Sequence, residues 1–94
     1  MTVHPNPIRE ETKISFDLDK PARTVTISIR NEAGELVREM IISGAEAGQN
    51  TVPWDGRDES GVMVPNGVYY CEVNFGNASS VGTATSVQNI VVVR

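Results

Sequence analysis

The sequence of 94 residues is poor in the residues that carry most catalytic and metal chemistry, with one histidine, His4, and one cysteine, Cys71. A single cysteine cannot form a disulfide within the chain, and a single histidine near the N-terminus has no partner for a triad or a histidine metal site. We interpret His4 as a solvated residue. We interpret Cys71 as a small buried strand residue, with a reactive or intermolecular thiol as the alternative.

Basic residues and long apolar runs are also scarce. Eight lysines and arginines stand against twelve acidic residues, which gives a formal net charge of −4. The basic residues are scattered, whereas nucleic-acid-binding proteins gather them in a patch or stripe. No segment approaches the ~20 apolar residues of a membrane span. We therefore expect neither a nucleic-acid partner nor membrane insertion.

The N-terminal residues lack the features of a signal peptide, because Met1-Thr2-Val3-His4 has neither a basic region nor an apolar stretch. Residues 1–11 contain Pro5-Asn6-Pro7, which cannot lie inside a helix. We predict an extended N-terminal linker over residues 1–11 and expect the chain to be a module of a longer protein or a mature form.

The remaining sequence is rich in alternating polar and apolar residues, which is the pattern of half-buried strands. Ile14, Phe16 and Leu18 share one face of the first such stretch, and a second follows at residues 24–30. Residues 35–42 also fit a helix turn, but they follow a hairpin signal at residues 31–34 and are predicted as a strand. The predicted strands cover residues 12–18, 24–30, 35–42, 51–54, 68–75 and 83–93. With two short loops at residues 43–50 and 76–82, they predict one all-β domain over residues 12–94, an antiparallel β-sandwich of about seven strands.

The most informative stretch runs from Val52 to Tyr70 and holds the only tryptophan and both tyrosines. Asp-Gly and Asn-Gly pairs favour tight turns, because glycine adopts positive φ and a short polar side chain closes the turn. We expect Trp54 and Tyr69 to pack in the core at the end of the sandwich. The residues predicted to build this structural motif are Trp54, Asp55, Gly56, Asp58, Gly61, Gly67 and Tyr69.

Three acidic side chains of this stretch, Asp55, Asp58 and Glu59, are weak candidates for a calcium site. Their spacing does not match the EF-hand pattern, and we favour the interpretation that the aspartates accept backbone N–H bonds within the turn. Two catalytic carboxylates would have to face each other across a substrate cleft, whereas these lie on one loop. We expect no cofactor and no catalytic residues.

Two further features point to surface contacts. Tyr70 lies on the strand face opposite Tyr69, which makes it a candidate for an exposed ligand contact, for instance stacking on a sugar. The run Ile90 to Val93 has high strand propensity. At a sheet edge this run would invite pairing with another chain, and the alternative is a central strand buried on both faces.

Several of these stretches together carry a resemblance to a known family. They are His4-Pro5-Asn6-Pro7 followed by residues 12–18, the hairpin segment at residues 31–38, and Trp54-Asp55-Gly56-Arg57-Asp58 with the downstream Gly67-Val68-Tyr69-Tyr70. The sequence resembles the Ig-like domain of the flagellar hook-capping protein family over roughly Pro5 to Phe75. This module also recurs near the C-termini of large bacterial secreted and cell-surface proteins.

The resemblance implies an Ig-like or fibronectin-III-like sandwich that is not an enzyme. We expect a non-catalytic structural or interaction module of a bacterial extracellular or cell-surface assembly, acting as a spacer, a scaffold or a self-assembling subunit. Its partners would be another protein or other domains of a parent chain, with self-association through an edge strand. The alternative is a carbohydrate-binding module that uses Tyr70 and nearby loop polar residues.

Overall fold

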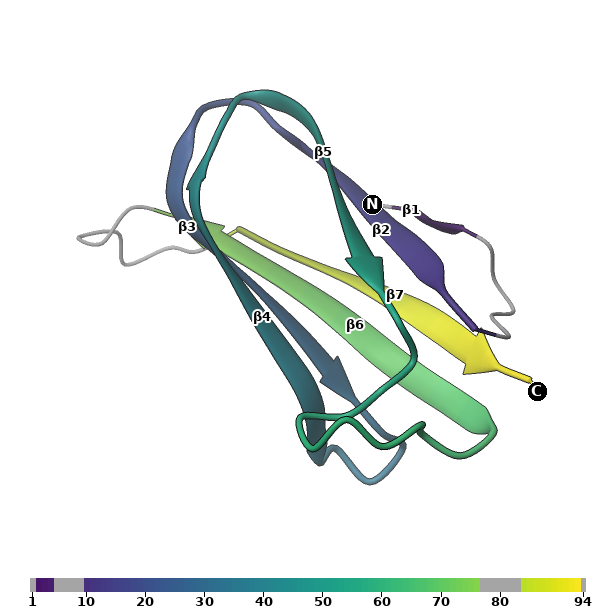
Figure 1. Cartoon of the computed structure of the whole chain (residues 1–94). Coiled ribbons are helices and arrows are strands. Elements are labelled where there is room, and N and C mark those ends of the chain that lie inside the picture. Colours follow the sequence, from purple (N-terminus) through teal and green to yellow (C-terminus); the bar gives the residue numbers. More distant parts are fainter. Residues whose placement is uncertain (1, 5–9, 77–83, 94) are drawn as a thin grey trace.

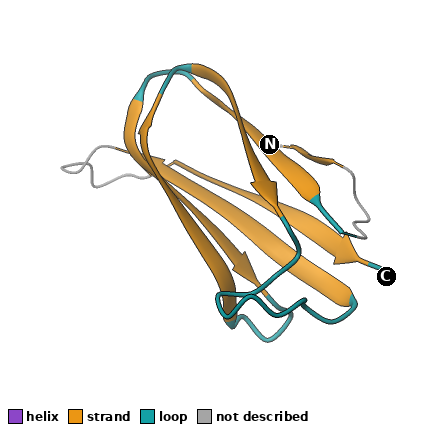
Figure 2. Ribbon diagram, in the orientation of Figure 1, coloured by secondary structure: helices purple, strands orange, loops and turns teal. Residues whose placement is uncertain are grey.

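The structure of the chain, a computed structural model, describes residues 2–4, 10–76 and 84–93. The described residues form strands joined by loops, with no helix among them (Figure 2). The strands are β1 (Thr2–His4), β2 (Thr12–Leu18), β3 (Ala22–Arg30), β4 (Leu36–Ala45), β5 (Gly48–Trp54), β6 (Gly67–Gly76) and β7 (Ala84–Val92). Within the described part of the chain there is accordingly no helix long and apolar enough to cross a membrane.

The strands form two antiparallel sheets that pack face to face (Figure 1). One sheet has the order β1-β2-β5 and the other the order β4-β3-β6-β7. Each sheet has one apolar face, and the two faces meet to form the core. The prediction of an all-β antiparallel sandwich of about seven strands is confirmed.

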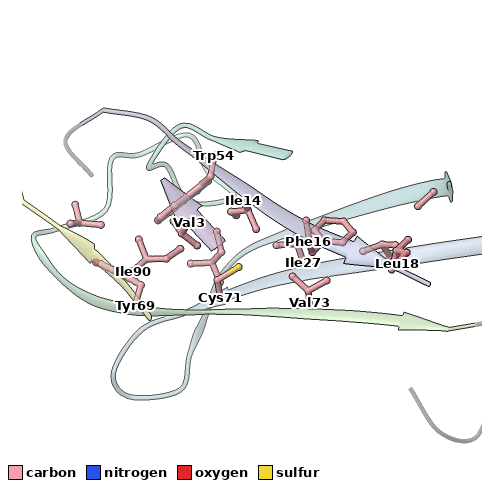
Figure 3. Close-up of a cluster of buried hydrophobic side chains, with 14 of the residues drawn as sticks. Val3, Ile14, Phe16, Leu18, Ile27, Trp54, Tyr69, Cys71, Val73 and Ile90 are labelled. Atoms are coloured by element: carbon pink, nitrogen blue, oxygen red, sulfur yellow. The ribbon is translucent and has the colours of Figure 1, made fainter. Parts of the chain in front are cut away.

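The core follows from the alternation in β2 and β3. Ile14, Phe16 and Leu18 point inward from β2, and the inward side chains of β3 oppose them (Figure 3). Burying a side chain of this size contributes about 1.5–3 kcal/mol relative to leaving it in water. The buried apolar residues of the other strands include Val3, Trp54, Tyr69, Cys71, Val73, Ile90 and Val92.

The sheet order settles the alternatives for two strands. β7 lies at the edge of the four-stranded sheet, so a central strand at Ile90 to Val93 is the wrong alternative. Ile90 and Val92 point into the core, while Val93 is exposed. β5 lies at the edge of the other sheet and contains Pro53, which pairs with Lys13. Proline has no N–H to donate to a ladder, and an edge strand tolerates it for that reason.

The prediction of a loop over residues 43–50 is wrong for most of these residues. β4 continues to Ala45 and β5 begins at Gly48, so only Glu46 and Ala47 lie between the two strands. The glycines of this segment lower its intrinsic strand propensity. Backbone pairing overrides this preference, because residues up to Ala45 pair with β3 and residues from Gly48 pair with β2.

The predicted linker also differs from the structure at its start. Thr2–His4 form β1, which pairs with β2 through Val3 and Ile14, and Val3 is buried. β1 also contacts β7 across the side of the sandwich. A short strand without a clear alternation signal gains its stability from this tertiary contact. Pro5-Asn6-Pro7 and residues 77–82 of the predicted hairpin loop lie outside the described residues.

Candidate functional site

Two connections lie side by side at one end of the sandwich, residues 31–35 between β3 and β4 and residues 55–66 between β5 and β6 (Figure 1). Glu59 ties the longer loop to β4. Its N–H donates to the Val37 carbonyl oxygen at 3.1 Å, and its carboxylate accepts from the Glu39 N–H at 2.7 Å. These two bonds, one from the backbone of Glu59 and one to its side chain, hold the loop against the edge of β4.

The shorter connection is the predicted hairpin. The Asn31 side-chain oxygen accepts from the N–H groups of Ala33 at 3.0 Å and Glu35 at 2.9 Å. The N–H of Gly34 donates to the Asn31 carbonyl, which closes a four-residue turn. Gly34 has a φ of 82°, the left-handed conformation expected for this position. The hairpin is therefore fixed by local hydrogen bonds.

The longer loop is held in the same way by its aspartates. Asp55 accepts from the N–H of Arg57 at 3.1 Å. Asp58 accepts from the N–H groups of Ser60 at 2.9 Å and Val62 at 3.0 Å. Gly61 follows with a φ of 81°. The carboxylates thus occupy the backbone donors of the turn, as the local interpretation of Asp55 and Asp58 requires.

Trp54 and Tyr69 close the core beneath this loop (Figure 3). Trp54 is 1% exposed, and its indole N–H donates to the Arg57 carbonyl at 3.0 Å. Its ring meets Tyr69 edge to face, with centroids 6.3 Å apart. The Tyr69 hydroxyl donates to the Pro65 carbonyl at 2.7 Å, which resembles the tyrosine corner of Ig-type sandwiches. These two rings are therefore unavailable as a sugar platform.

Between the two connections lies an open cleft of about 500 Å³. Its apolar lining comes from both sides, and its floor is formed by the buried residues Val64 and Tyr69. Polar residues line it as well. The lining residues are Asn31, Glu35, Leu36, Val37, Asp58, Glu59, Ser60, Val62, Met63, Val64, Pro65 and Tyr69. The size is within the range of ligand pockets.

Tyr70 lies elsewhere, on the outer face of the four-stranded sheet. It pairs with Arg30 of β3 and Asn89 of β7, and it is 38% exposed. Tyr70 does not line the cleft. The residues singled out in the sequence therefore separate into a turn motif at one end of the sandwich and one exposed tyrosine on a sheet face.

Cys71 follows Tyr70 and points the other way, into the core (Figure 3). Burial, together with the neighbouring charge of Glu72, raises the pKa of its thiol to about 12. A thiol in this environment stays protonated at neutral pH and is a poor nucleophile. The interpretation of Cys71 as a small buried strand residue is confirmed.

The calcium candidates do not converge on one point. Asp55, Asp58 and Glu59 each accept a hydrogen bond from a different backbone N–H group, and the amide bound by Glu59 belongs to β4. Among the described residues, no three histidine, cysteine or acidic side chains form a group that could hold a metal ion.

Sequence reasoning found both turns but missed the cleft between them. The cleft requires Asp58 and Glu59 to lie against residues of β4 about twenty positions earlier, as the bond from Glu59 to Val37 shows. The available signal was the apolar run Val62-Met63-Val64 inside the loop, together with Leu36 at the start of a strand. Exposed apolar residues in two separate turns indicate a shared surface only when the turns are known to be neighbours.

Comparisons with known proteins agree with this architecture. The chain is 32% identical over 85 residues to the basal-body rod modification protein FlgD of Salmonella typhimurium. The matched region covers 90% of this chain and 37% of that protein. The chain therefore spans little more than a third of that relative. Residues of this chain also superpose on FlgD from Pseudomonas aeruginosa with a TM-score of 0.73 at 24% identity, covering 87% of this chain and 60% of that one.

A second similar structure is dimeric latent PorU from Porphyromonas gingivalis, with a TM-score of 0.78 at 22% identity. The match covers 98% of this chain but 9% of PorU, so the same fold occurs there as a small part of a much larger protein. These likenesses confirm the predicted Ig-like sandwich. A family model described as the FlgD Ig-like domain matches residues 5–79, which is most of the sequence, and the chain therefore belongs to the FlgD Ig-like domain family.

Proposed function

We propose that this chain is a non-catalytic structural and interaction module of a bacterial extracellular or cell-surface assembly, acting as a spacer, a scaffold or a self-assembling subunit. One observation carries the proposal: the motif that gives the family resemblance is used to build the fold. Trp54 and Tyr69 are buried at the end of the sandwich, and the carboxylates of Asp55 and Asp58 accept local N–H groups. The motif therefore supplies a rigid end rather than reactive groups.

The family supports the same role. The relative from Salmonella typhimurium is named as a basal-body rod modification protein, which supports a role in an assembly. The PorU match supports the appended form of the module, because there the fold is a small part of a long chain. Partners would thus be other proteins or other domains of a parent chain.

Self-association would use an open sheet edge. β7 ends the four-stranded sheet, and the run Ile90 to Val93 covers its last three residues and the residue that follows. Strand addition at such an edge forms backbone hydrogen bonds and needs no specific side-chain chemistry. Light scattering on a size-exclusion column over a hundredfold range of concentration distinguishes the forms. A defined oligomer indicates a self-assembling subunit, and a monomer indicates a spacer or a module that binds a different protein.

A cross-linking experiment on intact cells tests the proposal as a whole. Lys13 and Lys20 are both exposed and lie outside the cleft, so an amine-reactive cross-linker reaches them without disturbing it. With a reagent that does not cross membranes, we expect the chain, or the protein that contains it, in cross-linked complexes at the surface. Recovery of the protein only from inside cells, without cross-links, would contradict the proposed role.

The structure does not favour the carbohydrate-binding alternative. Of the three aromatic residues considered for sugar stacking, Trp54 and Tyr69 are buried and Tyr70 alone is exposed on a sheet face. A sugar site normally combines apolar contact with several converging polar groups. We therefore retain the protein-interaction role as the proposal.

A further inference from the structure

Three exposed apolar side chains gather at the cleft between residues 31–35 and 55–66. Leu36 contributes from the start of β4, and Val62 and Met63 contribute from the longer loop, with Val62 60% exposed. Exposed apolar residues scattered singly over a surface are ordinary. Residues of this kind that line one cleft keep apolar surface in water until a partner covers it, which is typical of interaction sites.

The cleft is preformed. Its floor contains Tyr69, which is fixed by the bond from its hydroxyl to the Pro65 carbonyl. One wall is held by Asp58, which accepts two N–H groups of its own loop. The opposite wall is joined to the first by the two hydrogen bonds of Glu59 to β4. A partner would therefore bind without ordering a flexible loop, which lowers the entropic cost of binding.

The lining carries negative charge. Three carboxylates line the cleft, those of Glu35, Asp58 and Glu59, and among the described residues no lysine or arginine does. Three arginines beside the cleft donate to backbone carbonyls of its two connections, Arg30 to Gly34, Arg38 to Asp58 and Arg57 to Gly61. A cleft lined by apolar and acidic side chains complements an apolar side chain with basic neighbours.

We propose that this cleft binds an extended segment of a partner protein in which a large aliphatic or aromatic side chain is flanked by lysine or arginine. The apolar side chain would lie between Leu36 and Val62, and the basic groups would face Glu35 and Glu59. A second copy of this chain is a poorer occupant, because the formal net charge of each copy is −4. This inference rests on the proposed interaction role and names a surface and a partner chemistry for it.

Isothermal titration calorimetry with a defined probe tests the inference. The probe is an acetylated and amidated peptide, Lys-Leu-Lys-Phe-Lys-Leu-Lys, added to the full chain at low salt. We expect saturable one-to-one binding that weakens as salt is raised, because salt screens the charge attraction. The same peptide with glutamate in place of lysine, or with serine in place of leucine and phenylalanine, should not bind. No saturable binding of the lysine peptide, or equal binding of the glutamate peptide, would overturn the inference.

Matched variants locate the binding site. Val62 and Val87 are both valines with nearly equal exposure, 60% and 59%, but only Val62 lines the cleft. Loss of the buried contact should weaken binding by about tenfold in Val62→Ser, as expected from burial of one aliphatic side chain. Val87→Ser should bind as the unmodified chain does. An equal loss in both variants would overturn the assignment.

Charge reversal gives a second pair of matched variants. Glu35 lines the cleft, whereas Glu32 lies in the same hairpin and does not. Glu35→Lys should weaken binding and reduce its salt dependence, while Glu32→Lys should leave both nearly unchanged. Circular dichroism of each variant verifies that the fold is retained.

Light scattering separates this inference from the proposed function. Self-association that disappears in Val62→Ser would replace the partner protein by a second copy and overturn the stated occupant. Failure of the peptide to bind, with cross-linked surface complexes still present in cells, would overturn the cleft and leave the proposed interaction role intact.

Discussion

Truncation of Trp54 is the most direct test of how this sandwich is closed. Trp54→Ala removes an indole that is 1% exposed, its contact with Tyr69 and its hydrogen bond to the Arg57 carbonyl. Truncations of this kind in cores cost about 3–5 kcal/mol. A chain of 94 residues has a total stability of roughly 5–14 kcal/mol. The substitution is therefore expected to remove a large part of the stability.

The expected change is large enough to measure simply. At about 4–8 °C for each kcal/mol in a domain of this size, Trp54→Ala should lower the melting temperature by roughly 12–40 °C. The measurement is thermal and urea unfolding followed by far-ultraviolet circular dichroism. The urea slope should stay nearly constant, because the surface exposed on unfolding changes little.

Trp54→Phe serves as the graded companion. Phenylalanine keeps most of the apolar burial but cannot donate to the Arg57 carbonyl. We expect a smaller loss of about 1–2 kcal/mol. If Trp54→Ala folds with a melting temperature within a few degrees of the original chain, the indole does not carry the packing described here. An equal loss in both variants would attribute the effect to the hydrogen bond instead.

Three further predictions concern the loop and the thiol. Asp58→Ala should lower the free energy of unfolding by about 1 kcal/mol, more than Asp55→Ala does, because Asp58 accepts two N–H groups and Asp55 accepts one. Urea unfolding of both variants measures the two losses, and a larger loss in Asp55→Ala would contradict the prediction. Millimolar calcium should leave the melting temperature unchanged, since Asp55, Asp58 and Glu59 bind different amides; a saturable increase would establish a site. The raised pKa of Cys71 predicts a stability contribution that is complete below pH 9.0 and is lost as pH rises towards about 12, because only the unfolded thiol ionises in that window. Cys71→Ala should remove this part of the pH dependence, and an identical profile in both proteins would refute it.

Much of the sandwich could be predicted from local patterns. The strict alternation in β2 and β3 is enough to identify Ile14 and Ile27 as core residues, and both side chains are fully buried. The turn chemistry is equally local, since Asn31 and Asp58 bond N–H groups within four residues of themselves. Features decided by neighbours in sequence are visible in the sequence.

The errors arose where distant residues decide the structure. β1 forms because Val3 pairs with Ile14, and nothing in Thr2–His4 alone specifies that partner. The cleft has the same origin, because the bond between Glu59 and Val37 unites two turns that the sequence treats separately. The pairing of β4 and β5 with their neighbours likewise converted most of a predicted loop into strand. Tertiary pairing outweighs local propensity in each of these cases.

The edge-to-face contact of Trp54 with Tyr69 has a practical consequence. Trp54 is the only tryptophan of the chain, so its fluorescence comes from a single buried position. Tyr69 lines the cleft and packs against the indole of Trp54. A ligand bound in the cleft would therefore contact the ring that lies next to the fluorescent group. The protein therefore contains its own optical reporter, which should record events at this end of the sandwich without an added label.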